Sequence, residues 1–162
     1  MSQKKRLLKL YLDTSTVSHL YQQDVPDKMD DTLALWESLI AGEYEVVLSE
    51  VTTSELEGCE EPKLSVLADY LNKVSFKVLP LNDDVINLAN EIIDRGILTA
   101  KNLNDCRHIA AAILDGCDII VSWNFRHLVN VRTIDGVREI IVSKRYKPID
   151  IYSPNMLLKG DD

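Results

Sequence analysis

Short apolar runs along the chain predict a set of β-strands. The first run covers residues 7–12, is nearly continuous, and ends at the polar cluster Asp13-Thr14-Ser15. Such a run is typical of a strand that is buried on both faces at the centre of a parallel sheet. Four later runs predict further strands, over residues 44–48, 76–80, 118–122 and 149–152.

Between these runs the apolar positions recur at helical spacing. The spacing and the capping residues predict helices over residues 27–41, 49–57, 62–72, 82–96, 104–116 and 134–141. A short helix or loop is expected over residues 14–21, and a short terminal helix from Pro154. Because strands alternate with helices, the sequence indicates an α/β fold with a central, mostly parallel sheet of four to five strands.

The length and composition fit one globular domain. With 162 residues, 46% hydrophobic and 27% charged, the chain is expected to form a single domain over residues 1–162, with its core at about 7–153. Three cysteines match no metal-binding spacing: Cys59, Cys106 and Cys117. The last two lie in apolar surroundings and are expected in the core, which suits a reducing compartment.

The N-terminal segment, the lengths of the apolar runs and the net charge indicate which classes of protein the chain can belong to. The apolar run after the basic N-terminus is too short for a secretory signal, and no run reaches membrane-spanning length, so we expect a cytoplasmic protein with no membrane partner. The net charge is −8, from 26 acidic residues against 18 lysines and arginines. This balance argues against a broad basic surface for nucleic acid, but not against an enzyme that reaches phosphates through bound Mg²⁺ and a few local cations.

Asp13 is the strongest candidate for a functional acid. It follows the central strand, at the sheet edge where open α/β proteins place their ligand crevices. A carboxylate there is costly unless a basic side chain or a metal ion pairs with it. Alternatively, Asp13 is a turn residue or the N-cap of the next segment.

Two further acids are expected to join Asp13. Glu55 lies four residues after Val51 on a predicted helix beyond the second strand, so the two share a face, and Glu55 leans toward the crevice if Val51 packs on the sheet. Asp105 stands at the start of an otherwise apolar helix that must press against the sheet. The alternatives are an exposed helical glutamate for Glu55 and a helix cap or dipole partner for Asp105.

Other polar residues have weaker arguments. Asn124 follows the fourth strand and would order a metal-bound water or a phosphate oxygen, or simply cap the next turn. Asp118 enters its strand rather than leaving it, so it is expected at the opposite edge of the sheet. His108 is expected to pack beside Asp105, with little support as a metal ligand.

Three carboxylates packed together without a cation would repel one another, and hard oxygen ligands suit Mg²⁺ or Mn²⁺. No histidine pair or cysteine cluster suggests zinc. The histidines His19 and His127 have no partnered nucleophile, and no glycine-rich phosphate loop is present. The sequence therefore favours a magnesium or manganese site over a hydrolase triad or a nucleotide-binding loop.

Four short motifs, in this order and spacing, resemble a PIN domain. They are Leu12-Asp13-Thr14-Ser15, Ser49 with Glu55-Leu56, Asn104 to Ala112, and Val121 to Phe125. The likeness covers about residues 7–130, and the segment Pro148 to Pro154 fits one bacterial subgroup.

The resemblance implies a three-layer α/β/α fold and a Mg²⁺- or Mn²⁺-dependent endoribonuclease site. Asp13, Glu55 and Asp105 would be the metal-binding acids, and Asn124 would stand where many PIN domains have a fourth acid. Many relatives are VapC-type toxins of type II toxin–antitoxin pairs, held inactive by a small antitoxin, and commonly form homodimers. Bound metal would lower the pKa of a water molecule and stabilise charge on the scissile RNA phosphate.

Contacts to the substrate would come from a few local groups. The candidates are Thr14, Ser15, Arg107 and Arg126, with Lys101 as a further cation. Each of these cations is alternatively a solvated or salt-bridged surface residue.

Two other functions stay open. Asn124 and the acidic surface favour a catalytically weakened PIN-like module that acts through protein–protein binding. An aspartyl-phosphate phosphatase of α/β type has less support, because Asp13-Thr14-Ser15 lacks a second acid two positions after the first.

Overall fold

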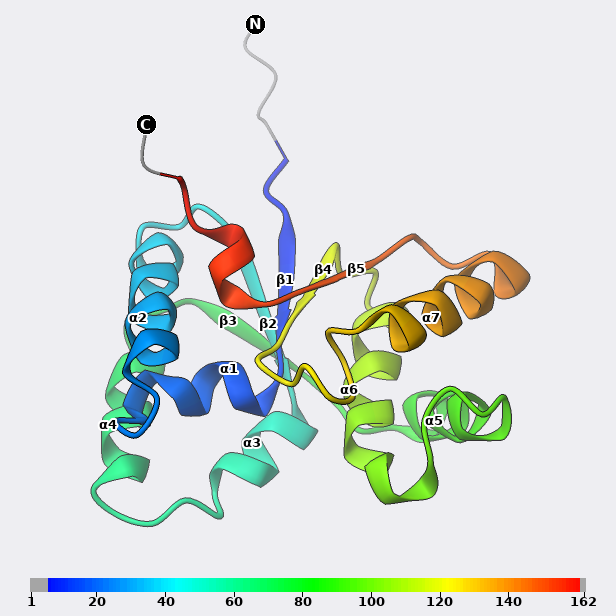
Figure 1. Ribbon diagram of the computed structural model, residues 1–162, viewed down its shortest axis with the longest axis horizontal. Coiled ribbons are helices and arrows are strands. Elements are labelled where there is room, and N and C mark those ends of the chain that lie inside the picture. Colours follow the sequence, from blue (N-terminus) through cyan, green and yellow to red (C-terminus); the bar gives the residue numbers. More distant parts are fainter. Residues whose placement is uncertain (1–5, 161–162) are drawn as a thin grey trace, which may run out of the picture.

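The computed structural model describes residues 6–160. Its centre is a five-stranded sheet in the order β3-β2-β1-β4-β5, and every neighbouring pair is parallel (Figure 1). The strands are β1 (Lys9–Leu12), β2 (Glu45–Ser49), β3 (Phe76–Leu79), β4 (Ile119–Val121) and β5 (Asp150–Tyr152). The predicted α/β class, the parallel sheet and all five strands are confirmed.

The central strand is buried on both faces, as the continuous apolar run requires. Leu10, Tyr11 and Leu12 have no exposed surface, and Tyr11 lies opposite Val47 of β2 and Ile120 of β4. The side chains of Tyr11, Val47 and Ile120 point to one side of the sheet, and their neighbours along each strand point to the other. Alternate residues therefore supply two separate hydrophobic cores.

Helices cover both faces of the sheet and make a three-layer α/β/α structure (Figure 1). One core lies under α5 (Asp83–Asp94), α6 (Leu103–Leu114) and α7 (Val131–Lys144). The other lies under α1 (Thr14–Ser18), α2 (Pro26–Ile40), α3 (Glu50–Leu56), α4 (Lys63–Leu71) and two 3₁₀ turns, η1 (His19–Tyr21) and η3 (Pro154–Leu157). A third 3₁₀ turn, η2 (Ala100–Asn102), leads into α6.

The element boundaries differ from the predicted ones where polar residues decide them. The first strand begins at Lys9 rather than at Leu7, and Leu7 and Leu8 are about half exposed. The last long helix is longer than residues 134–141: it starts after Asn130, whose side chain accepts from the Thr133 backbone N–H, and runs to Lys144. An N-cap is satisfied by a polar side chain rather than by an apolar one, so hydrophobic spacing alone underestimates this helix.

The two edges of the sheet carry different polar groups. At the amino edge, Asp118 accepts from the Lys9 backbone N–H and pairs with Arg6 and Lys147, as its position before β4 predicted.

Cys106 and Cys117 lie in the core, also as predicted. Within residues 6–160, no helix is both long and apolar enough to cross a membrane.

Candidate active site at the carboxyl edge of the sheet

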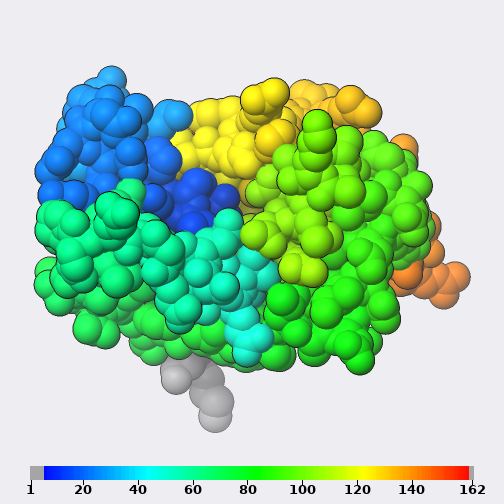
Figure 2. Space-filling model, turned by 90° about the horizontal axis from the view of Figure 1, so that it is seen from below, coloured from blue at the N-terminus to red at the C-terminus, as the bar shows by residue number. Residues whose placement is uncertain are grey.

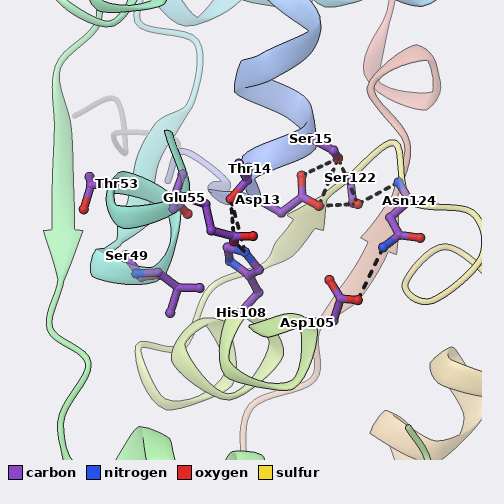
Figure 3. Close-up of polar contacts among 12 residues, drawn as sticks. Asp13, Thr14, Ser15, Ser49, Thr53, Glu55, Asp105, His108, Ser122 and Asn124 are labelled. Atoms are coloured by element: carbon purple, nitrogen blue, oxygen red, sulfur yellow. Dashed lines mark hydrogen bonds and ion pairs between the residues drawn. The ribbon is translucent and has the colours of Figure 1, made fainter. Parts of the chain in front are cut away.

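Asp13 follows β1 directly and lies at the carboxyl edge of the sheet. It is the N-cap of α1, since its carboxylate accepts from the Thr16 backbone N–H at 3.0 Å. The hydroxyl groups of Ser15 and Ser122 also donate to it, at 2.8 Å and 2.5 Å, and only 3% of the residue is exposed. Asp13 is therefore the N-cap of α1, and its carboxylate is held at the strand end (Figure 3). Its role as a functional acid stays a prediction.

Glu55 reaches the same edge from α3. Ser49 caps this helix, and Val51 packs inward, which turns Glu55 toward the strand ends as the four-residue spacing predicted. Its Oε1 accepts from Thr14 Oγ1 at 2.8 Å and lies 2.8 Å from His108 Nε2. Burial opposes ionisation of Glu55, but these hydrogen bonds hold its pKa below the ordinary value.

His108 orients Glu55 from a position inside the core. The ring is only 2% exposed, and its Nδ1 lies 2.6 Å from the Tyr11 hydroxyl, which lies 2.7 Å from Ser49 Oγ. Burial raises the pKa of Tyr11, so its hydroxyl keeps its proton. His108 was expected to pack beside Asp105, and its hydrogen bonds go to Glu55 and Tyr11.

Asp105 lies in the first turn of α6, with Asn124 and His127 as its partners. Asn124 Nδ2 donates at 3.5 Å, and His127 Nδ1 lies 3.4 Å away. Burial raises the pKa of Asp105, and the negative charges of Asp13 and Glu55 raise it further, against the opposing effect of His108 and His127. The carboxylates of Asp13 and Glu55 are thus close enough to Asp105 to oppose its ionisation.

Asn124 contacts the site and also shapes the loop after β4. Its Oδ1 accepts from the His127 backbone N–H at 2.9 Å while Nδ2 faces Asp105. The capping interpretation is therefore correct, and the same side chain also donates a hydrogen bond to Asp105. His127 was missed as a partner of Asp105, since nothing in the local pattern marks a histidine three residues after Asn124 as facing α6.

The other candidate residues are two hydroxyl-bearing residues, which support the acids, and three cations. Thr14 and Ser15 use their hydroxyl groups to hold Glu55 and Asp13. Arg107 lines a small pocket of about 80 Å³ together with Glu55, and its Nε is buried and unpartnered among the described residues. Arg126 is exposed in the loop after β4.

Lys101 completes the set of candidate cations. It lines an open hollow of about 360 Å³ between Glu55 and Asp105. Whether these hydroxyl groups and cations touch a substrate stays a prediction.

The face that carries these residues is built by segments far apart in the chain. Seen from the carboxyl ends of the strands, the segments after β1, β2 and β4 and the start of α6 come together (Figure 2). Within residues 6–160, no lysine or arginine lies within ion-pair distance of Asp13, Glu55 or Asp105. A bound cation would offset this uncompensated negative charge.

The types of side chain at this edge suit a metal ion, but their spacing in this structure does not yet form a binding site. Three carboxylates with no cysteine among them are the oxygen-rich set that Mg²⁺ and Mn²⁺ prefer. In the described part of the chain, however, no three acidic, histidine or cysteine side chains are grouped closely enough to hold a metal ion. Hydrogen bonds from His108 and Asn124 instead hold two of the acids.

A comparison with protein families agrees with this arrangement. The profile of the PIN domain matches residues 10–132, which include most of β1, all of β2 to β4 and every candidate acid. The chain belongs to the PIN-domain family. The predicted resemblance is thus confirmed for most of the chain, and no curated protein matches it closely enough to report as a relative.

Two solved structures share the fold of this PIN domain. One is from the crystal structure of VapBC2 from Rickettsia felis bound to a DNA fragment from their promoter, with a TM-score of 0.56, 15% identity, and coverage of 90% of this chain and 98% of that one. The other is VapBC-1 from nontypeable Haemophilus influenzae, with a TM-score of 0.54, 16% identity, and coverage of 91% and 98%. At such identities the likeness concerns the fold.

Proposed function

We propose that this PIN domain is a Mg²⁺- or Mn²⁺-dependent endoribonuclease and acts as the toxin of a type II toxin–antitoxin pair. The observation that carries the proposal is that Asp13, Glu55 and Asp105 lie at the same edge of the sheet and that, among the described residues, no lysine or arginine is within ion-pair distance of them. Family membership supports a nuclease. The two similar structures are both VapBC pairs, which supports a small antitoxin as partner. A homodimer and a cytoplasmic location stay predictions.

In this proposal the three acids would hold one or two ions, which when bound supply a more acidic water molecule and offset charge on the scissile phosphate. The chain's own residues fix the acids in place. Ser15 and Ser122 hold Asp13 between two hydroxyl groups, and His108 holds Glu55. Such support limits the movement of each carboxylate, which is what efficient metal binding requires.

The decisive experiment is RNA cleavage by the purified protein with Mn²⁺, with Mg²⁺ and with a chelator. Asp105→Asn is the best inactive variant, because it removes a charge that the fold opposes while keeping the side-chain shape. Asp94→Asn is the matched control, since Asp94 is exposed at the end of α5, on a helix that contributes no candidate acid. We expect metal-dependent cleavage by the wild type and Asp94→Asn, and none by Asp105→Asn.

A second candidate function is a PIN-like module that has lost catalysis and acts through a protein partner. Asn124 favours it, because an amide stands where many relatives have a fourth acid and donates to Asp105 instead of binding a cation. Calorimetry with Mn²⁺ separates the two. Binding that Asp105→Asn abolishes would support the nuclease, whereas no binding by the folded wild type would favour the module.

A further inference from the structure

An exposed aromatic ring lies in the loop after β4, which contacts two of the candidate acids. Phe125 is 47% exposed although it directly follows Asn124, the residue that contacts Asp105. The loop holds it firmly: its backbone N–H donates to the Trp123 carbonyl at 3.0 Å, and its own carbonyl accepts from Asn130 Nδ2 at 3.4 Å. A large apolar ring is thus held about half exposed to solvent on a fixed backbone, and packing in the core does not explain this position.

The ring rests on a second aromatic residue that is anchored to the core. Trp123 is only 6% exposed, and Phe125 meets it edge to face, with ring centroids 6.1 Å apart. The Trp123 indole N–H donates to Thr32 Oγ1 at 2.8 Å, and its backbone N–H donates to Ser15 Oγ, the hydroxyl that holds Asp13. The same short loop therefore contacts two of the three acids and presents Phe125.

Two basic residues, Lys28 and Arg126, accompany Phe125. Lys28, from the first turn of α2, places its ammonium 5.3 Å from the Phe125 ring centroid and 5.6 Å from that of Trp123. Arg126 follows Phe125 in the chain and is exposed. Among the residues that the structure describes, neither cation lies within ion-pair distance of a carboxylate. In a chain of net charge −8, two uncompensated cations beside an exposed ring favour a ligand that is aromatic and anionic.

We propose that Phe125 is a stacking platform for an unpaired base of single-stranded RNA, with Lys28 and Arg126 facing the neighbouring phosphates. The inference rests on the proposed function and extends it to the substrate class. Aromatic side chains with adjacent cations bind single strands, because every unstacked base offers a face and every nucleotide a charge. Bases in a duplex are already stacked, so this surface selects loops and linkers.

The test measures RNA binding apart from cleavage, in chelator, with an unstructured RNA that carries 2-aminopurine. Replacing Phe125 by Ala is expected to weaken binding by about 5-fold or more, and to abolish the quenching of 2-aminopurine that stacking causes. Phe125→Trp is expected to restore both. Phe76→Ala is the matched control, because Phe76 is the only other phenylalanine, is 37% exposed, and lies at the opposite edge of the sheet.

Two further measurements define the role of charge and strandedness. Lys28→Gln is expected to reduce the slope of log affinity against log salt by about 1, as the loss of one phosphate contact should. A blunt duplex of the same sequence is expected to bind the wild type more weakly and to be insensitive to Phe125→Ala. Equal loss of single-stranded and duplex binding would contradict stacking.

The outcomes separate this inference from the function on which it rests. If the wild type cleaves and binds RNA but Phe125→Ala does so equally well, the stacking site is refuted and the nuclease stands. If the wild type neither binds nor cleaves RNA, both proposals fail. If Phe125→Ala changes sedimentation of the protein and leaves RNA affinity unaltered, the ring belongs to a protein interface, which also overturns the inference.

Discussion

His108 Nε2 lies 2.8 Å from Glu55 Oε1, and the ring that makes this contact is buried beneath the site. An ionised carboxylate only accepts hydrogen bonds, so Nε2 donates. With a neutral imidazole, Nδ1 then accepts from the Tyr11 hydroxyl, which leaves Ser49 to donate to the Tyr11 oxygen. The orientation of Glu55 is thus set by a chain of hydrogen bonds that runs from β2 through β1 to α6.

Removal of His108 should destabilise the protein strongly. His108→Ala leaves the Tyr11 hydroxyl and Glu55 without their shared partner and opens a buried space, so we expect the free energy of unfolding to fall by about 2–4 kcal/mol. His127→Ala is the control, since His127 is partly exposed and has alternative access to water. Urea unfolding measures both. Similar losses for the two variants would show that the buried network adds no stability.

The same substitution at two of the acids should act in opposite directions. Asp105→Asn removes a charge that burial and two neighbouring carboxylates oppose, so we expect stabilisation; a gain of about 1 kcal/mol would raise Tm by roughly 2–4 °C. Asp13→Asn replaces one of the two acceptor oxygens by an NH₂ donor where four donors from Ser15, Thr16 and Ser122 converge, so we expect a loss of about 1–3 kcal/mol. Calorimetry at neutral pH in chelator compares the two, and a lower Tm for Asp105→Asn would contradict the charge argument.

The stability difference between Asp105→Asn and the wild type should depend on pH. The folded-state pKa of Asp105 is raised above its unfolded value, so the ionised side chain opposes folding at neutral pH. As the pH falls through the folded-state pKa, the wild type takes up a proton and the advantage of the variant should disappear. Urea unfolding across this range measures the difference, and an advantage that grows on acidification would refute the assignment.

Glu55→Gln should show the opposite pH signature. The pKa of Glu55 is held below its unfolded value, so the carboxylate contributes stability above the unfolded pKa and loses it as the pH falls through the folded-state pKa. We expect Glu55→Gln to be less stable than the wild type at neutral pH and the two to converge on acidification. The same unfolding series gives this comparison, with Asp94→Asn as an unchanged reference.

Asn124→Asp should make the protein more dependent on metal. The change replaces a donor to Asp105 by a further negative charge, so in chelator we expect a lower Tm than that of the wild type. Added Mn²⁺ should recover the loss and stabilise the variant further, because a ligand that binds only the folded state shifts unfolding by mass action. A Tm that does not respond to Mn²⁺ in either protein would count against a metal site.

The sequence determined the architecture and the position of each acid along the chain. A short continuous apolar run is typical of a doubly buried strand, and the residue after it, Asp13, was therefore expected at the carboxyl edge of the sheet. The spacing of Val51 and Glu55, and the apolar helix behind Asp105, indicated that both acids would face the strand ends if these helices packed on the sheet. These features depend on local periodicity and on the parallel topology that it imposes, so they could be predicted from residues alone.

Only the tertiary structure decided which side chains support the acids. His108 lies three residues from Asp105 yet bonds to Glu55, and His127 comes to Asp105 from the loop after β4. Lys28 meets Phe125 across 97 positions of the chain. Such contacts join separate elements at a few ångströms, and they depend on how helices are rotated and packed on the sheet, which the periodicity of a single segment does not contain.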